Sequence, residues 1–275
     1  MRVRLLITSL RINFFTGFKR SIFSKRCILP LLGVFVILLM LGIILTNRRN
    51  QQWVNRFFAL FHGWATLSIM VPLGALYLSI SAIGDERESG SLVYITSRPV
   101  PRFTFPMGRG LGAGVAAYFY SVTLVVGSII LFNILNRIMG DELNLDPSHL
   151  KALLVSTFVS CFCFTALGMF LGSFLKRGLL FGTGLVLGWE VLIGSLMIFN
   201  KITGLNSLLI TDTTRKICFL YLPDFIQNQI RKKMPLLGKE NISELFTNAT
   251  KYFLVFFILS LIIFSIKEHP YRRKD

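Results

Sequence analysis

Long runs of apolar residues alternate with short polar and charged stretches along this chain. A helix that crosses the roughly 30 Å hydrocarbon core of a bilayer needs roughly 20 mostly apolar residues, because each residue advances it by about 1.5 Å. Six runs meet or approach this length, so the pattern predicts an all-α integral membrane protein with six transmembrane helices. The predicted spans are residues 28–45, 57–83, 111–135, 152–175, 178–199 and 252–266.

The composition supports a membrane protein and argues against a water-soluble enzyme. Of the 275 residues, 53% are hydrophobic and only 16% are charged, whereas a soluble domain has about 25% charged residues. The mean hydropathy is +0.63. We therefore treat residues 1–275 as a single transmembrane domain.

The net charge of +17 would suggest a nucleic-acid partner in a soluble chain, but here the Lys and Arg residues lie mainly between the apolar runs. Basic residues close to span ends favour the cytoplasmic side. The side that holds both termini carries 17 of them and the other side 13. We expect a multi-pass protein of the cell membrane, in a bacterium the inner membrane, with both termini in the cytoplasm. The basic cluster 231–233 is the main feature against this orientation.

The first apolar run is preceded by a basic segment that does not read as a cleavable signal peptide. Charged residues interrupt it and no small-residue cleavage site follows. Within residues 3–23, Val3, Ile7, Leu10 and Phe14 recur at helical spacing, which predicts a helix lying in the membrane interface. The alternative is a simple basic leader to the first span.

A gap of about fifty residues, 200–251, separates the last two predicted spans. Its apolar patches 208–210, 218–222 and 242–246 are too short to cross a bilayer. We predict an outer loop containing interfacial or outer helices above the exit of a transport path. A half-inserted re-entrant pair is the alternative.

Glu190 is the ionisable residue that lies well inside a predicted span. A charge at mid-membrane costs about 2.5–3.5 kcal/mol on insertion scales, so this side chain should face the protein interior. It either lines the transport path or forms a buried hydrogen bond that fixes helix packing.

Pairs of glycines four residues apart predict close helix contacts. These pairs are Gly110/Gly114, Gly168/Gly172, Gly178/Gly182 and Gly184/Gly188.

The stretch between the second and third spans, 84–109, is unusual because acidic residues cluster in it. Gly90 can bend or end a helix at low steric cost. Ser91 could then cap a short helix over 92–95, and Pro99 would stop it. The result would be a short cytoplasmic helix, apolar on one side, which a groove in a partner protein could hold.

This stretch resembles the signature of type-2 ABC transporter permeases, the membrane subunits of many bacterial exporters. That signature runs acidic, any, Glu, any, Gly, Thr or Ser, Leu, then apolar positions, Pro and a basic residue. Ser91 is often Thr in the family. A weaker resemblance lies in Gly188-Trp189-Glu190. The residues that match the main signature are Glu86, Glu88, Gly90, Ser91, Leu92, Pro99 and Arg102.

The resemblance implies a permease subunit of an ATP-driven exporter, working as a homodimer or with a similar second subunit. The short helix would be a coupling helix that docks on a separate ATPase subunit. The chain has no Gly-x-x-x-x-Gly-Lys-Ser/Thr phosphate-binding loop, so we expect it to be no enzyme, to bind no cofactor and to leave ATP to its partner. The predicted coupling residues are Glu86, Glu88, Gly90, Ser91, Leu92, Arg98, Pro99 and Arg102.

Two other functions remain open at this point. One is a non-transporting membrane scaffold or assembly subunit, which nothing in the residues excludes. The other is a membrane enzyme acting on lipid, which needs His, Asp or Ser clustered at one interface. The three histidines are scattered at 62, 149 and 269, so they suggest neither that enzyme nor a metal site.

Overall fold

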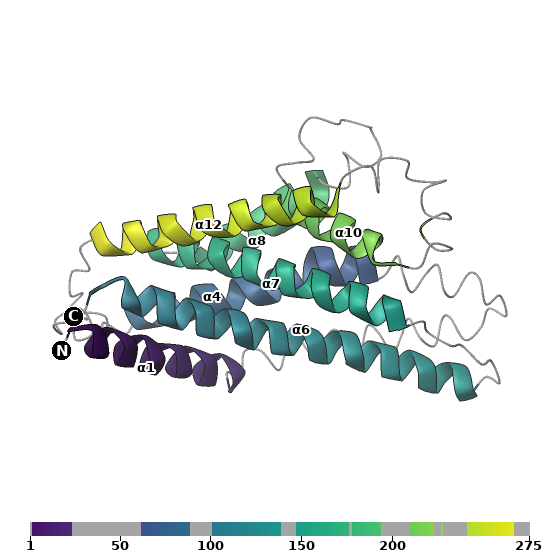
Figure 1. The fold of residues 1–275 in the computed structure, drawn as a ribbon, viewed down its shortest axis with the longest axis horizontal. Helices are drawn as coiled ribbons and strands as arrows, with labels where there is room; N and C mark the ends of the chain where they lie inside the picture. Colours follow the sequence, from purple (N-terminus) through teal and green to yellow (C-terminus); the bar gives the residue numbers. More distant parts are fainter. Residues whose placement is uncertain are drawn as a thin grey trace.

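The computed structural model describes residues 2–23, 62–88, 101–138, 147–175, 178–193, 209–222, 227 and 241–266. The regular elements in these ranges are all helical, as predicted (Figure 1). Two of them, η1 and η2, are π-helical. The elements are α1 (Arg2–Ile22), η1 (His62–Met70), α4 (Val71–Glu88), α6 (Thr104–Ile138), α7 (Pro147–Phe174), α8 (Gly178–Gly184), η2 (Leu185–Ile193), α10 (Ile210–Leu220) and α12 (Ile242–Ile266).

Four helices are long and apolar enough to cross a membrane, and the segment Gly178–Leu192 is apolar but shorter. These four span candidates are Thr66–Glu86, Thr104–Ile130, His149–Phe174 and Ile242–Ile266. They support a multi-pass membrane protein. The predicted first span, 28–45, and the residues 57–61 and 194–199 of two others lie outside the described residues, so the number six stays a prediction.

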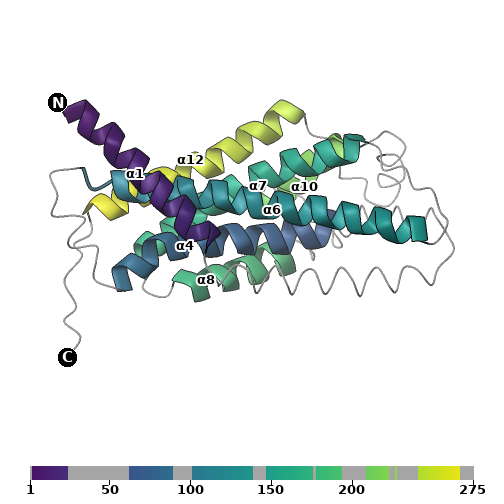
Figure 2. The same cartoon turned by 90° about the horizontal axis from the view of Figure 1, so that it is seen from below.

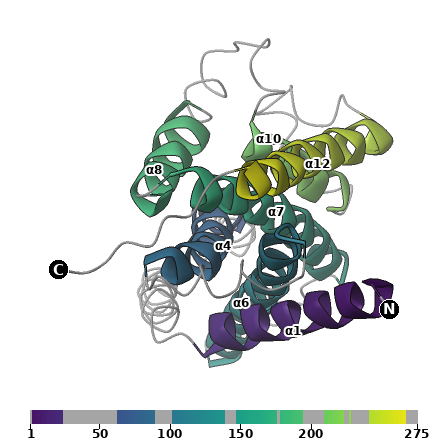
Figure 3. The ribbon, with the colours of Figure 1, turned by 90° about the vertical axis from the view of Figure 1, so that its left-hand side faces the viewer.

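The long helices α4, α6, α7 and α12 run along one axis (Figures 1 and 2). Helix α7 contacts α4, α6, α10 and α12, whereas α1 lies across α6 at one end of the bundle (Figure 3). That end also holds the last residues of α4, α7 and α12 and the first residues of α6 and α8 (Figure 1). We call it the α1 end of the bundle.

The core of the bundle is closely packed around α7. Leu76 of α4, Ala113 of α6 and Phe164 of α7 belong to one buried cluster. The predicted glycine contacts hold for three of the four pairs: an added Cβ at Gly114 would meet Thr165, and at Gly172 it would meet the Ile80 backbone. Among the described residues nothing lies within 4 Å of such a Cβ at Gly184 or Gly188.

The predicted cytoplasmic segment 84–109 between the second and third spans is helical at both of its ends, and its place outside the membrane stays a prediction. Helix α4 continues through its charged turn to Glu88, and α6 begins at Thr104, seven residues before the predicted start of that span. Hydropathy places the boundary where charge appears, but the hydrogen bonds of a helix continue past the membrane edge. Residues 89–103 therefore separate the two helices.

The predicted outer loop, 200–251, contains helices, and its place outside the membrane stays a prediction. Helix α12 begins at Ile242, ten residues before the predicted sixth span. Its first turns are polar, so a search for apolar residues alone does not detect them as part of the helix. Helix α10 lies within the gap, but it packs against α7 and α12 and is buried over most of its length. Helix α10 therefore packs on the helices of the bundle.

The N-terminal helix is confirmed over Arg2–Ile22. Its partly buried residues Leu10 and Phe14 belong to the predicted apolar stripe, but Ile7 of that stripe is exposed. The outward side is apolar too, with Leu5, Ile12 and Phe15 about half exposed. A helix that is apolar outside as well as inside suits contact with lipid.

Candidate functional site

Three helices meet at the α1 end of the bundle, where α4 ends and α6 begins (Figure 1). Helix α1 approaches α6 so closely that a Cβ at Gly17 would lie 2.7 Å from the carbonyl oxygen of Arg109. A Cβ at Gly108 would lie 2.6 Å from Cβ of Asn13. The hydroxyl of Tyr120 on α6 also donates a hydrogen bond to the carbonyl of Ile22. Glycine thus allows the two backbones into contact, and α1 is held along α6.

An ion cluster joins α4 to both of these helices. The Glu86 side chain lies near the end of α4 and is 8% exposed as a residue. Its Oε1 accepts a hydrogen bond from Nη1 of Arg109, at 2.6 Å, and another from Nη1 of Arg20. Nη2 of Arg20 lies 3.9 Å from Oδ2 of Asp85. One carboxylate therefore connects α1, α4 and α6.

Arg109 has a second contact that fixes its direction. Its guanidinium carbon lies 4.8 Å from the centroid of the Phe105 ring, one helical turn earlier. Arg109 and Glu86 are both buried, at 7% and 8% exposure. A buried charge is tolerated when it is paired and hydrogen-bonded, and removing one partner of such a pair costs about 3–5 kcal/mol. The cluster therefore ties the end of α4 to the start of α6.

The arrangement is suited to holding the end of α4, the start of α6 and helix α1 together. The residues of the cluster are two guanidinium groups and two carboxylates, which supply charge and hydrogen bonds. In the described part of the chain no group of three His, Cys, Asp or Glu side chains could hold a metal ion. We call the cluster of Arg20, Asp85, Glu86 and Arg109 the α1–α4–α6 ion cluster.

The predicted coupling residues fall in three places. Glu86 lies in the ion cluster, and Glu88 is the last residue of α4. Arg102 is exposed in the turn before α6, where Oγ1 of Thr104 donates a hydrogen bond of 2.8 Å to the carbonyl of Pro101. The other predicted coupling residues lie outside the described residues: Gly90, Ser91, Leu92, Arg98 and Pro99.

Glu190 lies elsewhere, in η2, and is 2% exposed. Its carboxylate accepts hydrogen bonds from the backbone nitrogens of Ile210 and Thr211, at 3.2 and 3.0 Å, and from Oγ1 of Thr211 at 2.6 Å. Leu209, the residue that precedes α10, offers no side-chain cap. A carboxylate at a helix N-terminus satisfies free N–H groups and faces the positive end of the helix dipole. Glu190 therefore caps α10 from a distant part of the chain.

Helix α10 carries further buried charge. Nζ of Lys216 lies 2.8 Å from Oδ2 of Asp212 one turn earlier. Nε of Arg215 donates a hydrogen bond of 2.6 Å to Oγ of Ser68 in η1. Burial lowers the pKa of Arg215, and the negative charges of Asp212 and Glu190 oppose this shift. These contacts attach α10 to η1 and η2, which explains how so polar a helix is buried in the bundle.

Sequence reasoning missed the two basic partners of Glu86 and the helix that Glu190 caps. Arg20 and Arg109 were counted only as charges beside span ends, and Arg215 only as part of the outer gap. Arg109 carried a usable signal, because it stands inside the apolar run of α6, where a charge needs a partner. Arg20 carried none, since it lies 66 positions from Glu86.

Comparison with models of known protein families identifies a family for this chain. The sequence profile described as ABC-2 family transporter protein matches residues 18–207. This region contains Arg20, Glu86, Arg109 and Glu190, and it runs from the last turn of α1 past the end of η2. No curated protein matches the chain.

Proposed function

The chain belongs to the ABC-2 family of transporter proteins, and on this basis we propose that it is the permease subunit of an ATP-driven exporter whose ATP is hydrolysed by a separate ATPase subunit. The family is a membrane component of ABC transporters, so the chain is a transport permease. The single observation that carries the proposal is the family match over 18–207. The ATPase, the outward direction and the assembly below are the proposed part.

Residues 89–103 are the proposed contact with the ATPase. They join the end of α4 to the start of α6, and both of these helix ends are held by Glu86 and Arg109 at 2.6 Å. A segment whose two ends are attached to one rigid cluster transmits force to the helices, whereas a loosely held loop would absorb it. This supports a coupling role for Gly90, Ser91, Leu92, Arg98 and Pro99 within the segment and for Glu88 and Arg102 beside it.

The proposed assembly has two permease subunits and two ATPase subunits in the cell membrane, with both termini of this chain in the cytoplasm. The described helix ends support the orientation, because α1, the end of α4, the start of α6 and the end of α12 lie at the same end of the bundle (Figure 1). That is the end that carries the larger share of the basic residues of the connecting segments.

Co-purification of the ATPase tests the proposal most directly. The permease is expressed together with a candidate ATPase subunit from the same organism, and the amount of ATPase that stays bound in detergent is measured. Leu92→Asp and Arg102→Glu should each reduce the bound ATPase, because the first places a charge on the proposed apolar face and the second reverses an exposed charge beside it. Basal ATP hydrolysis of the complex should change together with binding.

Arg137→Glu is the matched control, because Arg137 is exposed at the opposite end of α6 and makes the same charge change. It should leave the bound ATPase unchanged. Equal retention of ATPase by wild type, L92D and R102E would contradict the docking assignment. Failure of any ATPase to bind the wild-type chain would favour a scaffold role instead.

A further inference from the structure

The outward side of α1 carries a row of basic residues. The helix contains no acidic residue, and Arg4, Arg11 and Lys19 are exposed on it. Steps of seven and eight residues separate them, each close to two turns of an α-helix, so they follow one another along one face at intervals of about 10–12 Å. We call Arg4, Arg11 and Lys19 the α1 basic stripe.

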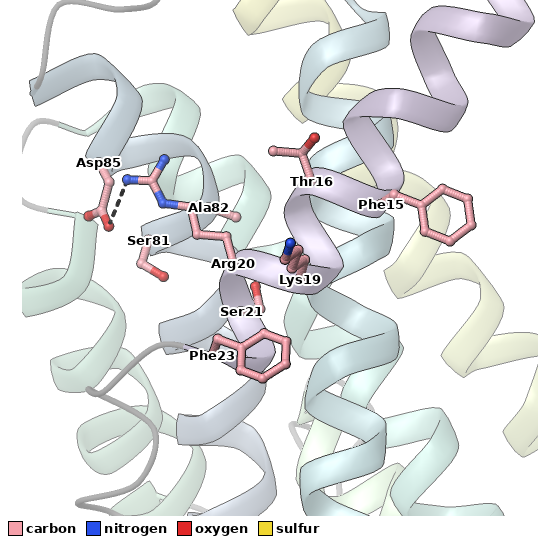
Figure 4. A pocket seen from close by; sticks show the side chains of 9 residues that line it. All are labelled: Phe15, Thr16, Lys19, Arg20, Ser21, Phe23, Ser81, Ala82 and Asp85. Carbon is pink, nitrogen blue, oxygen red and sulfur yellow. Dashed lines mark ion pairs between the residues drawn. The ribbon is translucent and has the colours of Figure 1, made fainter.

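The charges of this stripe are not used by the fold, in contrast to that of the neighbouring Arg20. Figure 4 shows Arg20 reaching toward Asp85 across the cavity of about 730 Å³ between α1 and α4. Arg20 also pairs with Glu86, so its charge is neutralised within the protein. No ion pair links the stripe to a carboxylate in the described part of the chain. The stripe therefore offers three positive charges to a partner outside the bundle.

Apolar side chains border the stripe. Leu5 and Ile12 each follow an arginine of the stripe by one position, about 100° further round the helix, and are 49% and 59% exposed. The guanidinium carbon of Arg11 lies 5.9 Å from the ring centroid of Phe15, which is 56% exposed. In Figure 4 this ring lies on the side of α1 away from Asp85. Cations beside bulky apolar side chains suit the boundary between lipid headgroups and acyl chains.

The position of α1 on α6 indicates that lipid is what surrounds it. Tyr120, within the span candidate Thr104–Ile130, donates a hydrogen bond to the carbonyl of Ile22 at the end of α1. Beside this contact the rings of Phe18 and Phe119 meet edge to face with centroids 6.0 Å apart, and Phe119 is 55% exposed. Helix α1 therefore lies beside the first half of a candidate transmembrane helix, where an exposed apolar side faces acyl chains.

We propose that the α1 basic stripe binds the phosphates of anionic phospholipids of the phosphatidylglycerol type, while Leu5, Ile12 and Phe15 contact their acyl chains. Three cations without a neighbouring carboxylate attract a headgroup of net negative charge. A zwitterionic headgroup would bring its own cation into the same positive field, so it is disfavoured. The proposal does not depend on the ATPase or on the direction of transport.

Native mass spectrometry of the full chain in detergent measures lipid binding directly. The protein is titrated with phosphatidylglycerol and phosphatidylcholine of identical acyl chains, and the dissociation constant of the first bound lipid is determined for each. Wild type should bind phosphatidylglycerol more tightly. Combining Arg4→Gln, Arg11→Gln and Lys19→Gln should weaken this binding by at least about fivefold, which corresponds to about 1 kcal/mol for one basic residue at an anionic surface, and leave phosphatidylcholine binding unchanged.

A second triple variant is the matched control. Arg137→Gln, Lys151→Gln and Lys251→Gln remove the same charge from exposed positions of α6, α7 and α12. This variant should keep the affinity for phosphatidylglycerol. The variant with Arg4→Lys and Arg11→Lys retains the charges of the stripe and should also bind as wild type does. Melting temperatures of all variants, compared with wild type, show that each remains folded.

Glycerol 3-phosphate separates a lipid surface from a site for a soluble phosphate compound. Added at a hundredfold excess, it should not displace phosphatidylglycerol, because it lacks the acyl chains. Displacement by it, equal affinity of wild type for the two lipids, or an unchanged affinity in the stripe variant would each overturn the proposal. An equal loss of affinity in the control variant would do the same, because binding would then follow net charge and not the stripe.

Discussion

Oε1 of Glu86 on α4 and Nη1 of Arg109 on α6 lie 2.6 Å apart, and both side chains are almost fully buried. The second partner of Glu86, Arg20 on α1, has a side chain that is 47% exposed. The carboxylate is therefore paired with one buried and one accessible cation. This asymmetry predicts unequal effects when the members of the cluster are replaced one at a time.

Glu86→Gln should destabilise the protein strongly, because it leaves the buried guanidinium of Arg109 without a countercharge. We expect a loss of about 3–5 kcal/mol in the free energy of unfolding. Arg20→Gln should cost about 1 kcal/mol or less, since solvent screens the exposed cation and Arg109 still pairs with Glu86. Unfolding by denaturant in mixed micelles measures both. Equal losses of unfolding free energy for the two variants would contradict the unequal roles of the buried Arg109 and the exposed Arg20.

This result also affects how the ATPase contact is tested. Replacement of Glu86 by Lys would place three cations together in the cluster, so loss of ATPase binding could follow from misfolding. Glu88→Lys, at the last residue of α4, avoids this ambiguity and should reduce bound ATPase while the melting temperature stays within a few degrees of wild type. A normal amount of ATPase on E88K would remove Glu88 from the contact.

Gly112→Ala should separate α1 from α6. The added Cβ would lie 2.8 Å from the backbone nitrogen of Phe18 and closer still to the carbonyl oxygen of Phe14. Backbone atoms cannot turn aside as a flexible side chain can, so the helices must move apart. The matched control is Gly127→Ala on the same helix, where nothing described lies within 4 Å. It should be neutral or stabilising by up to about 1 kcal/mol, because alanine favours the helix.

Limited proteolysis at residues near the start of α1 measures this separation. Gly112→Ala should make α1 more susceptible to trypsin, which cleaves after its Arg and Lys residues, while Gly127→Ala should match wild type. Identical digestion of the two variants would mean that the close approach of α1 to α6 is not required to hold α1 in place.

Glu190→Gln distinguishes a packing role from a path role. Gln retains one acceptor oxygen but loses the negative charge at the N-terminus of α10, so we expect a loss of about 1–2 kcal/mol in stability. Thr211→Val removes the 2.6 Å hydrogen bond to the same carboxylate and should have a similar effect. If packing is the role, both variants export normally once folded. A folded E190Q with export abolished and a T211V with normal export would assign Glu190 to the path.

Cys218 should be unreactive in the folded protein. It lies on α10, and burial raises the pKa of its thiol to about 12 from an ordinary 9.0. The thiolate that reacts with maleimide is therefore scarce at pH 8. Unfolding restores the ordinary pKa, so the unfolded state ionises above pH 9 and the folded state loses stability as the pH rises through that range.

Labelling of a variant with Cys27, Cys161 and Cys163 changed to Ala checks this prediction. Cys218 should react only after denaturation. The control is Glu244→Cys in a chain whose four native cysteines are all Ala, because Glu244 is exposed at the start of α12. It should react at once. Rapid labelling of Cys218 without denaturant would place α10 at the surface.

Local pattern alone determined the helical class of this protein, its place in the membrane and its family resemblance. Apolar runs of spanning length predicted the long helices, since burial of apolar surface in lipid depends on the number of residues and little on which helix lies beside them. The acidic cluster 85–88 and the glycine pairs were visible in the same way. The predicted helix ends were less accurate. An apolar run ends at the first charged residue, whereas a helix continues until its backbone hydrogen bonds are interrupted.

Only the tertiary structure decided which charges meet. Glu86 and Arg20 lie 66 positions apart, and Glu190 lies 20 positions from the first of the N–H groups that it caps. Electrostatic pairing depends on distance in space, and no periodicity along the chain encodes it. For the same reason the cavity between α1 and α4 was not foreseen: its two sides come from residues 15–23 and 81–85, which become neighbours only when α1 and α4 are both packed at one end of the bundle.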